Sequence, residues 1–176
     1  MEDRYRSRLE KVRREMAAAG IPQLIVSDAA ALWYLTGETI HSGERLTVLV
    51  IQQEKVCWLR NRLFPLYHQT DAIEDISFAD GDDGIALLAK PLEKGVCGVD
   101  QTWAAGFLLA LQDKRRDISF VNGSFLVDQV RAIKDSEEID LMREASRIND
   151  RAMERMKQWI AVGMTEKACA DKLLTV

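Results

Sequence analysis

Arg45-Leu-Thr-Val-Leu-Val-Ile-Gln52 is followed, after the polar tripeptide Gln53-Glu54-Lys55, by Val56-Cys-Trp-Leu-Arg60. Both runs are rich in residues that favour strands, and the short polar segment between them is typical of a hairpin connection. These residues therefore predict two antiparallel strands, and the rest of the chain can be arranged around them.

Helical and strand-like patterns alternate on both sides of this hairpin. Upstream, apolar residues recur three and four apart from 4 to 19, and a short apolar run covers 23–27. Asp28 is suited to cap a helix that runs to Leu35 and ends at Gly37. Alternation of this kind predicts an α/β fold whose sheet is covered on both faces.

Downstream of the hairpin the same alternation continues. Residues 61–69 predict a short helix or turn, and strands are expected at 73–78, 96–99 and 118–121. One helix should run from about residue 85 to Gly95, and Thr102 is expected to cap the next. A long helical pattern then covers 135–160, and another helix begins at Thr165 and Glu166. Because the chain ends within that last helix, we expect the natural protein to continue.

Charge and composition exclude several classes of protein. The net charge of −4 and the pI of about 5.3 provide no basic field for a nucleic acid. The first twenty residues are charged, and no apolar run approaches the ~20 residues of a membrane span, so we expect a cytoplasmic protein with no membrane partner. Its three cysteines are widely spaced, which favours reduced thiols over disulfides.

The sequence contains little that could carry chemistry by itself. Its only histidines, His41 and His68, have no ligand-type neighbour at helical metal-binding spacing. The acidic loop 80–84 begins like a calcium loop, but Pro91 stands where a bidentate Glu is required. Glycine-rich phosphate loops and serine nucleophile elbows are absent from the sequence. We therefore predict no catalytic residue and no metal site in this chain.

One aromatic segment has two interpretations. Trp33 and Tyr34 precede Gly37 and a polar loop that contains His41. They could line a ligand surface, or they could close a helix whose aromatic rings pack on the sheet. Composition alone favours packing.

Three stretches carry a family resemblance. They are Leu24-Ile-Val-Ser-Asp28, Trp33-Tyr-Leu-Thr-Gly37 and, most specific, Val127-Asp-Gln-Val-Arg-Ala-Ile-Lys-Asp-Ser-Glu-Glu-Ile-Asp-Leu-Met-Arg-Glu-Ala145. Together they resemble the amino-terminal domain, and the linker that follows it, of the creatinase, aminopeptidase P and prolidase family. The resemblance implies a ribonuclease-H-like, three-layer α/β/α domain with a mixed sheet at 1–127. Residues 128–176 would then be the linker and first helices of a truncated "pita-bread" catalytic domain.

The same resemblance implies a function. The parent would be a Xaa-Pro dipeptidase that binds two divalent metals, manganese, cobalt or zinc, through ligands absent from this chain, so the chain alone would be inactive. This domain would pack against its own carboxy-terminal catalytic domain, form homodimers and narrow the active-site mouth toward short proline-containing peptides. The residues that the resemblance places near such a mouth are Trp33, Tyr34, His41, Arg60, Arg62, Tyr67 and His68.

Alternatives from other classes remain open at this point. The chain could be a non-catalytic binding or dimerisation module, or part of a creatinase-like amidinohydrolase that reuses the domain. A nuclease is disfavoured, because the predicted strands 24–27, 47–51 and 96–99 carry no carboxylate for a metal.

Overall fold

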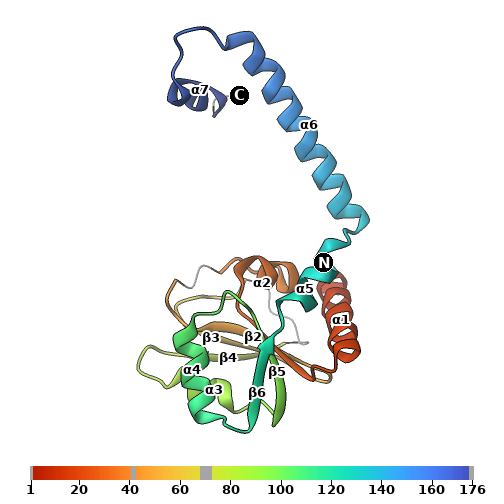
Figure 1. Ribbon diagram of the computed structural model, residues 1–176, viewed down its shortest axis with the longest axis vertical. Coiled ribbons are helices and arrows are strands. Elements are labelled where there is room, and N and C mark those ends of the chain that lie inside the picture. Colours follow the sequence, from red (N-terminus) through yellow and green to blue (C-terminus); the bar gives the residue numbers. More distant parts are fainter. Residues whose placement is uncertain (1, 41–42, 68–72, 175–176) are drawn as a thin grey trace. The chain divides into compact units, whose positions relative to one another are not determined.

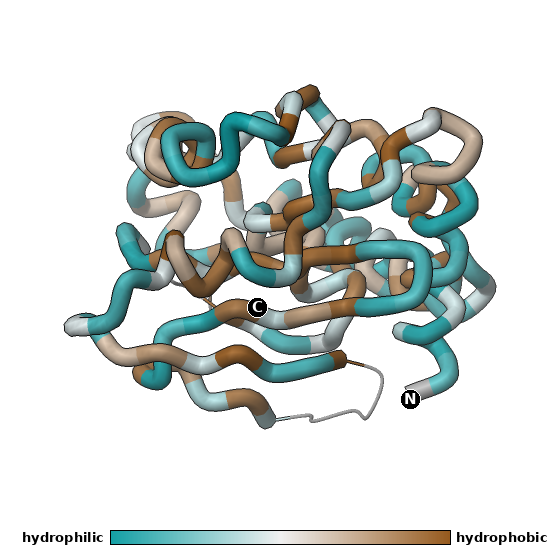
Figure 2. The backbone as a smooth tube through the Cα atoms, turned by 90° about the horizontal axis from the view of Figure 1, so that it is seen from below, coloured by the Kyte–Doolittle hydropathy of each residue, from teal (hydrophilic) through white to brown (hydrophobic). Residues whose placement is uncertain are grey.

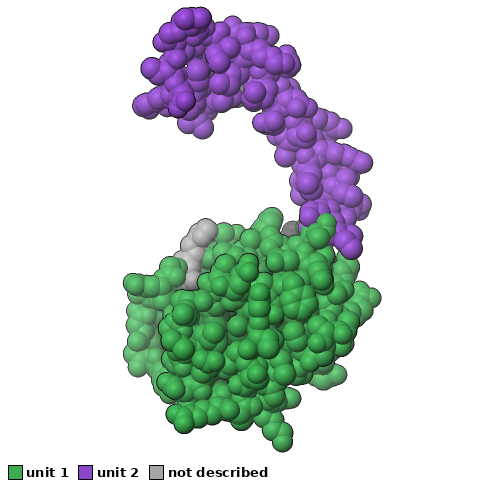
Figure 3. Space-filling model, in the orientation of Figure 1, with its two compact units in different colours: residues 1–132 green, residues 133–176 purple. Residues whose placement is uncertain are grey.

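A computed structural model describes residues 2–40, 43–67 and 73–174 of the chain. Two units can be distinguished, residues 1–132 and residues 133–176, which Figure 3 colours green and purple. The predicted boundary follows residue 127, whereas the first unit of the structure ends slightly later, with a complete helix. The assignment of the second unit to a catalytic domain stays a prediction.

A six-stranded mixed sheet forms the centre of the first unit, in the order β4-β3-β2-β1-β5-β6. The pairs β1–β2 and β2–β3 are antiparallel, whereas β1–β5, β5–β6 and β3–β4 are parallel. The predicted hairpin is confirmed, with Ile51 opposite Val56 and Thr47 opposite Arg60. The strands are β1 (Gln23–Val26), β2 (Thr47–Gln52), β3 (Val56–Asn61), β4 (Glu74–Phe78), β5 (Gly95–Val99) and β6 (Ile118–Asn122).

Helices cover both faces of this sheet. One face packs against α1 (Glu2–Ala19), α2 (Ala29–Thr36) and α5 (Ser124–Ala132), and the other against α3 (Gly84–Ala89) and α4 (Ala105–Lys114) (Figure 1). Successive strand residues contribute to opposite layers, as side chains of a strand must. Leu49 and Trp58 pack with α1, α2 and α5, while Val50 and Leu59 pack with the α3–α4 layer.

Figure 2 shows hydrophobic stretches of backbone along these strands. Every residue of β1, β2 and β3 is buried. The predicted three-layer α/β/α class is confirmed.

Local signals set most helix ends as predicted. The Asp28 side chain accepts a hydrogen bond from the N–H of Ala31 at the start of α2. At the other end Gly37 has φ 79°, a left-handed conformation that favours glycine.

Two predictions about the second layer were wrong. Thr102 does not cap α4, because the chain first makes a turn in which the N–H of Trp103 donates to the carbonyl of Asp100; the N-cap is Ala104. Helix α3 ends at Ala89 and not near Gly95, because Pro91 lacks an N–H and disfavours a helical residue before it. Helix α5 was not recognised as a separate helix.

The second unit consists of α6 (Ser136–Trp159) and α7 (Glu166–Leu173). Helix α6 begins with a capping box: Asp135 accepts from the N–H of Glu138, whose carboxylate accepts from the N–H of Asp135. Thr165 caps α7. None of the described residues of α6 or α7 is buried within this chain. In the described ranges, no helix is both long and apolar enough to cross a membrane.

Candidate functional site

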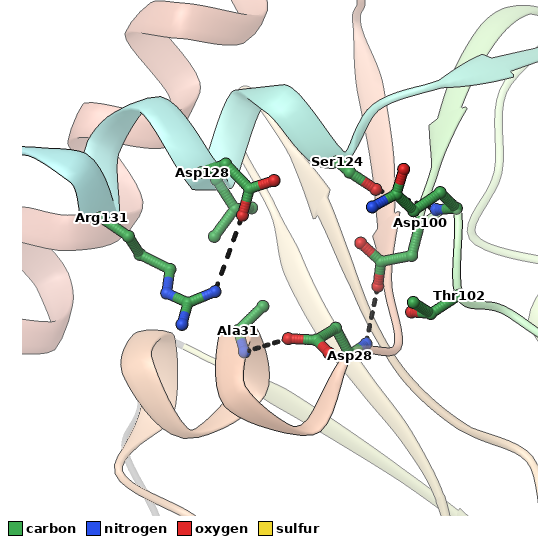
Figure 4. A pocket seen from close by; sticks show the side chains of 9 residues that line it. Asp28, Ala31, Asp100, Thr102, Ser124, Asp128 and Arg131 are labelled. Carbon is green, nitrogen blue, oxygen red and sulfur yellow. Dashed lines mark hydrogen bonds and ion pairs between the residues drawn. The ribbon is translucent and has the colours of Figure 1, made fainter.

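A polar pocket of about 150 Å³ lies at the edge where β1, β5 and β6 end (Figure 4). Ligands of open α/β sheets bind outside the carboxyl ends of parallel strands, so this edge is the first place to look for a site. Figure 4 shows Asp128 and Arg131 of α5 on one side of the pocket, and Asp28 and Asp100 on another. The pocket is lined by Asp28, Ala31, Asp100, Gln101, Thr102, Ser124, Val127, Asp128 and Arg131.

Asp100 is the most buried polar group of this pocket, with 6% of its surface exposed. Its Oδ2 accepts hydrogen bonds from the N–H of Ser27, from Ser27 Oγ at 3.1 Å and from the N–H of Asp28 at 2.7 Å. Burial raises the pKa of the Asp100 carboxyl above its usual value, and these three donors only partly oppose that shift. The carboxylate thus joins the end of β1 to the end of β5.

The other polar groups around the pocket are also engaged with one another. Asp28 caps α2, and Arg131 forms an ion pair with Asp128 at 3.6 Å. Ser124 Oγ accepts from the N–H of Gln101 at 2.8 Å. None of the residues that line this pocket is a histidine or lysine. These contacts hold the strand ends and helices together.

A second pocket of about 220 Å³ shares Asp28 and Thr102 with the first. Arg45 lies at its rim and forms two 3.1 Å hydrogen bonds with the carboxylate of Asp80. Asn61 Nδ2 also donates to Asp80, at 2.6 Å. The hydrogen bond from Arg45 lowers the pKa of the Asp80 carboxyl. The Arg45–Asp80 pair therefore stays charged and ties the start of β2 to the end of β4.

The described side chains form no cluster suited to a metal ion. In residues 2–40, 43–67 and 73–174, no three His, Cys, Asp or Glu side chains converge to hold an ion. Cys57 and Cys97 are free and buried, and burial raises the pKa of Cys97 to about 12, which disfavours the thiolate that a metal needs. The described residues therefore do not fit the two metals that the resemblance implies.

The predicted substrate-shaping residues near α2 differ in how exposed their side chains are. Trp33 is 59% exposed, on the last turn of the helix. Tyr34 is buried, and the guanidinium of Arg8 lies 4.0 Å from the centre of its ring. His41 lies outside the described residues. The structure therefore leaves Trp33 accessible to a ligand and packs Tyr34 between helices.

The predicted residues after the hairpin also divide into two kinds. Arg60 is buried and forms a bidentate ion pair with Asp75, at 2.8 and 2.7 Å, and its Nη1 donates to the carbonyl of Phe64 at 2.6 Å. Arg62 and Tyr67 are exposed. His68 lies outside the described residues.

Arg60 therefore anchors the segment that presents Arg62 and Tyr67. For the described residues among the seven, the substrate-shaping role stays a prediction.

Sequence reasoning missed Arg8 and Asp100. Arg8 is 6% exposed, although it stands in a strongly charged stretch of the sequence. Its spacing from Leu9, Val12 and Met16 places it beside the buried stripe of α1, and this was the available signal. Asp100 directly follows a predicted strand, a position that often carries functional side chains in α/β folds.

Comparisons with known proteins agree with this architecture. The sequence profile of the creatinase/prolidase N-terminal domain matches residues 8–133. The probable dipeptidase PepE of Mycobacterium tuberculosis is 28% identical over 170 residues, which are 92% of this chain and 45% of that protein.

Solved structures of similar proteins superpose on most of the chain. A prolidase from Thermococcus sibiricus gives a TM-score of 0.85 at 23% identity and covers 96% of this chain and 48% of its own. A dipeptidase from Pyrococcus horikoshii gives a TM-score of 0.82 at 30% identity. The match covers 94% of this chain and 48% of the dipeptidase. The chain thus spans about half the length of the relatives it matches. With the profile match over most of the first unit, it belongs to the creatinase/prolidase N-terminal domain family.

Proposed function

We propose that this chain is the amino-terminal, accessory part of a metal-dependent Xaa-Pro dipeptidase, in which it shapes the active-site mouth for short peptides that contain proline. The observation that carries the proposal is the family membership over residues 8–133, together with relatives that are named dipeptidases and prolidases. These relatives are about twice as long as this chain.

In this proposal the chain has no peptidase activity by itself. Peptide hydrolysis by this class of enzyme needs metal ions that activate a water molecule. The described residues offer no group of three His, Cys, Asp or Glu side chains that could hold a metal ion. The two divalent metals, manganese, cobalt or zinc, would therefore be bound by a carboxy-terminal catalytic domain.

The accessory role is supported by what the first unit leaves exposed. Trp33, Arg62 and Tyr67 present two aromatic rings and a cation, groups that can pack against a short peptide and pair with its carboxylate. We also propose that the complete enzyme is a homodimer and is located in the cytoplasm.

The test is an assay of the full-length protein. With manganese, cobalt or zinc present, it should hydrolyse Xaa-Pro dipeptides and leave matched dipeptides without proline intact, while residues 1–176 alone should be inactive. Trp33→Ala should raise KM, and Leu109→Ala, a change at an exposed apolar residue on α4, should not. Absence of Xaa-Pro hydrolysis with every metal would refute the proposal, and hydrolysis of creatine in its place would indicate the amidinohydrolase alternative.

A further inference from the structure

Helix α1 holds the last turn of α2 through Arg8. The two helices pack side by side on one face of the sheet (Figure 1). Arg8 Nη1 donates a 2.9 Å hydrogen bond to the carbonyl of Tyr34, across 26 residues of sequence. The guanidinium also lies 4.0 Å from the centre of the Tyr34 ring. One buried side chain thus contacts both the backbone and the ring of Tyr34.

This contact meets a requirement of the helix end. The last carbonyl groups of a helix have no partner within the helix, and the negative end of its dipole favours a cation nearby. Just beyond the helix, the N–H of Glu38 donates to Thr36 Oγ1 at 3.1 Å. Arg8 therefore provides both a donor and a positive charge where α2 ends.

Tyr5, one turn before Arg8 on α1, contacts the same helix end. A Cβ placed on Gly37 would lie 2.5 Å from the Tyr5 hydroxyl, so the backbone of Gly37 packs directly against this ring. The guanidinium of Arg8 also lies 5.9 Å from the centre of the Tyr5 ring. Arg8 and Tyr5 together restrict where the last turn of α2 can lie.

Trp33 belongs to this restricted turn. Its carbonyl accepts the 2.8 Å hydrogen bond from the N–H of Gly37, while its ring is 59% exposed. Because Tyr34 is the next residue, any shift of its carbonyl moves the backbone that carries Trp33. Arg8 itself is 6% exposed, so its influence on substrate binding would act through the residues that it contacts, among them Tyr34 in this turn.

We propose that Arg8 is a positioning residue for substrate binding: it fixes the last turn of α2 so that the exposed ring of Trp33 is held at the mouth of the dipeptidase site. This inference rests on the proposed function. It concerns substrate affinity, since neither residue is placed at the reacting atoms, and it therefore predicts a change in KM with kcat retained.

The experiment compares Arg8→Met with Arg13→Met in the full-length enzyme. Arg13 is a matched control, because it also lies on α1 and its Nε donates a 2.9 Å bond to the backbone carbonyl of Gln52, away from α2. We expect Arg8→Met to raise KM for Xaa-Pro dipeptides about three- to tenfold, as for loss of one ordinary hydrogen bond, with kcat changed less than about twofold. Arg13→Met should keep the wild-type KM.

A second comparison distinguishes positioning from general loss of structure. In a Trp33→Ala background, Arg8→Met should cause no further rise in KM, because the ring that it positions is absent. Arg8→Lys keeps a cation at the end of α2 and should recover at least half of the affinity lost in Arg8→Met. If Arg8→Met does not fold, Arg8→Lys is tested in its place. We expect Arg8→Lys to raise KM about twofold, and we expect no such rise in the Trp33→Ala background.

The outcomes separate this inference from the proposed function. If the unaltered enzyme fails to hydrolyse Xaa-Pro dipeptides, the proposed function is wrong. If it does hydrolyse them, equal KM values for the Arg8 and Arg13 variants would overturn the positioning role alone. The positioning role would also be overturned if Arg8 substitution raised KM by the same factor in the Trp33→Ala background as in the unaltered enzyme.

Discussion

Substitution of Gly37 by alanine tests how closely α1 and α2 pack. Gly37 ends α2 with φ 79°, and its N–H donates to the carbonyl of Trp33 at 2.8 Å. An L-residue in this left-handed conformation costs roughly 1–2 kcal/mol. The added methyl group would also lie 2.5 Å from the hydroxyl and 2.6 Å from Cζ of Tyr5, far inside contact distance.

Relief of that overlap requires Tyr5 or the helix end to move, and overpacking of this kind costs about 1–3 kcal/mol. We therefore expect Gly37→Ala to lower the free energy of unfolding by about 2–5 kcal/mol in total. Gly20→Ala is the matched control. Gly20 follows α1 with φ 68°, and a Cβ there would meet nothing within 4 Å, so only the conformational cost applies.

The measurement is urea denaturation followed by circular dichroism, with both variants compared with the unaltered protein. The difference between the two glycine variants reports the Tyr5 contact alone, because their backbone conformations are alike. Tyr5→Ala should make Gly37→Ala less costly, since it removes the overlapping atoms. Equal destabilisation by the two glycine substitutions, within about 0.5 kcal/mol, would refute this reasoning.

Three further predictions concern other parts of the chain. Asp100→Ala should destabilise the protein by about 2–4 kcal/mol in denaturation, because buried N–H donors lose their acceptor, whereas Asp100→Asn should cost less. Because burial raises the Asp100 pKa in the folded state, protonation favours folding. The stability of wild type relative to Asp100→Asn should therefore fall as pH rises from about 4 to about 7, and a rise would contradict the shift. A thiol reagent should modify Cys169 in the native protein and Cys97 only after unfolding; rapid labelling of Cys97 would contradict its burial. Asp135→Ala should speed amide hydrogen exchange at Glu138 about fivefold through loss of the cap, and unchanged exchange would contradict the capping box.

The sequence was sufficient for features that depend on neighbouring residues. The hairpin follows from strand-forming runs on both sides of three polar residues, and the ends of α2 follow from Asp28 and Gly37. Each signal acts within a few residues of the structure it specifies. The same holds for the capping box of α6.

Errors arose where distant residues decide the structure. Helix α5 was interpreted as part of a linker, although Leu126, Val127 and Val130 have helical spacing. The reason is that the face of α1 that buries these residues cannot be seen in the sequence. The cap of α4 was misplaced because Trp103 is buried in the layer of α3 and α4, so the chain turns once more before the helix begins.

The residues of the candidate site also include some whose surroundings depend on distant parts of the chain. The family resemblance placed Tyr34 and Arg60 near a substrate, and in the structure each has a partner 26 or 15 residues away, Arg8 and Asp75. A single sequence provides no sign of these pairings. The exposure of Trp33 and Tyr67 agrees with the predicted surface, whose role in substrate binding awaits the kinetic tests above.

The position of β1 in the sheet has a consequence for the order of folding. All four residues of β1 are buried between β2 and β5, and the Gln23 side chain bonds to the backbone of Glu93, 70 residues later. During synthesis β2 can pair with β1 early, but the other edge of β1 stays open until β5 has been made. Unpaired strand edges promote association between chains. Release of a chain shortened before residue 95 should therefore yield aggregates and not a smaller folded domain.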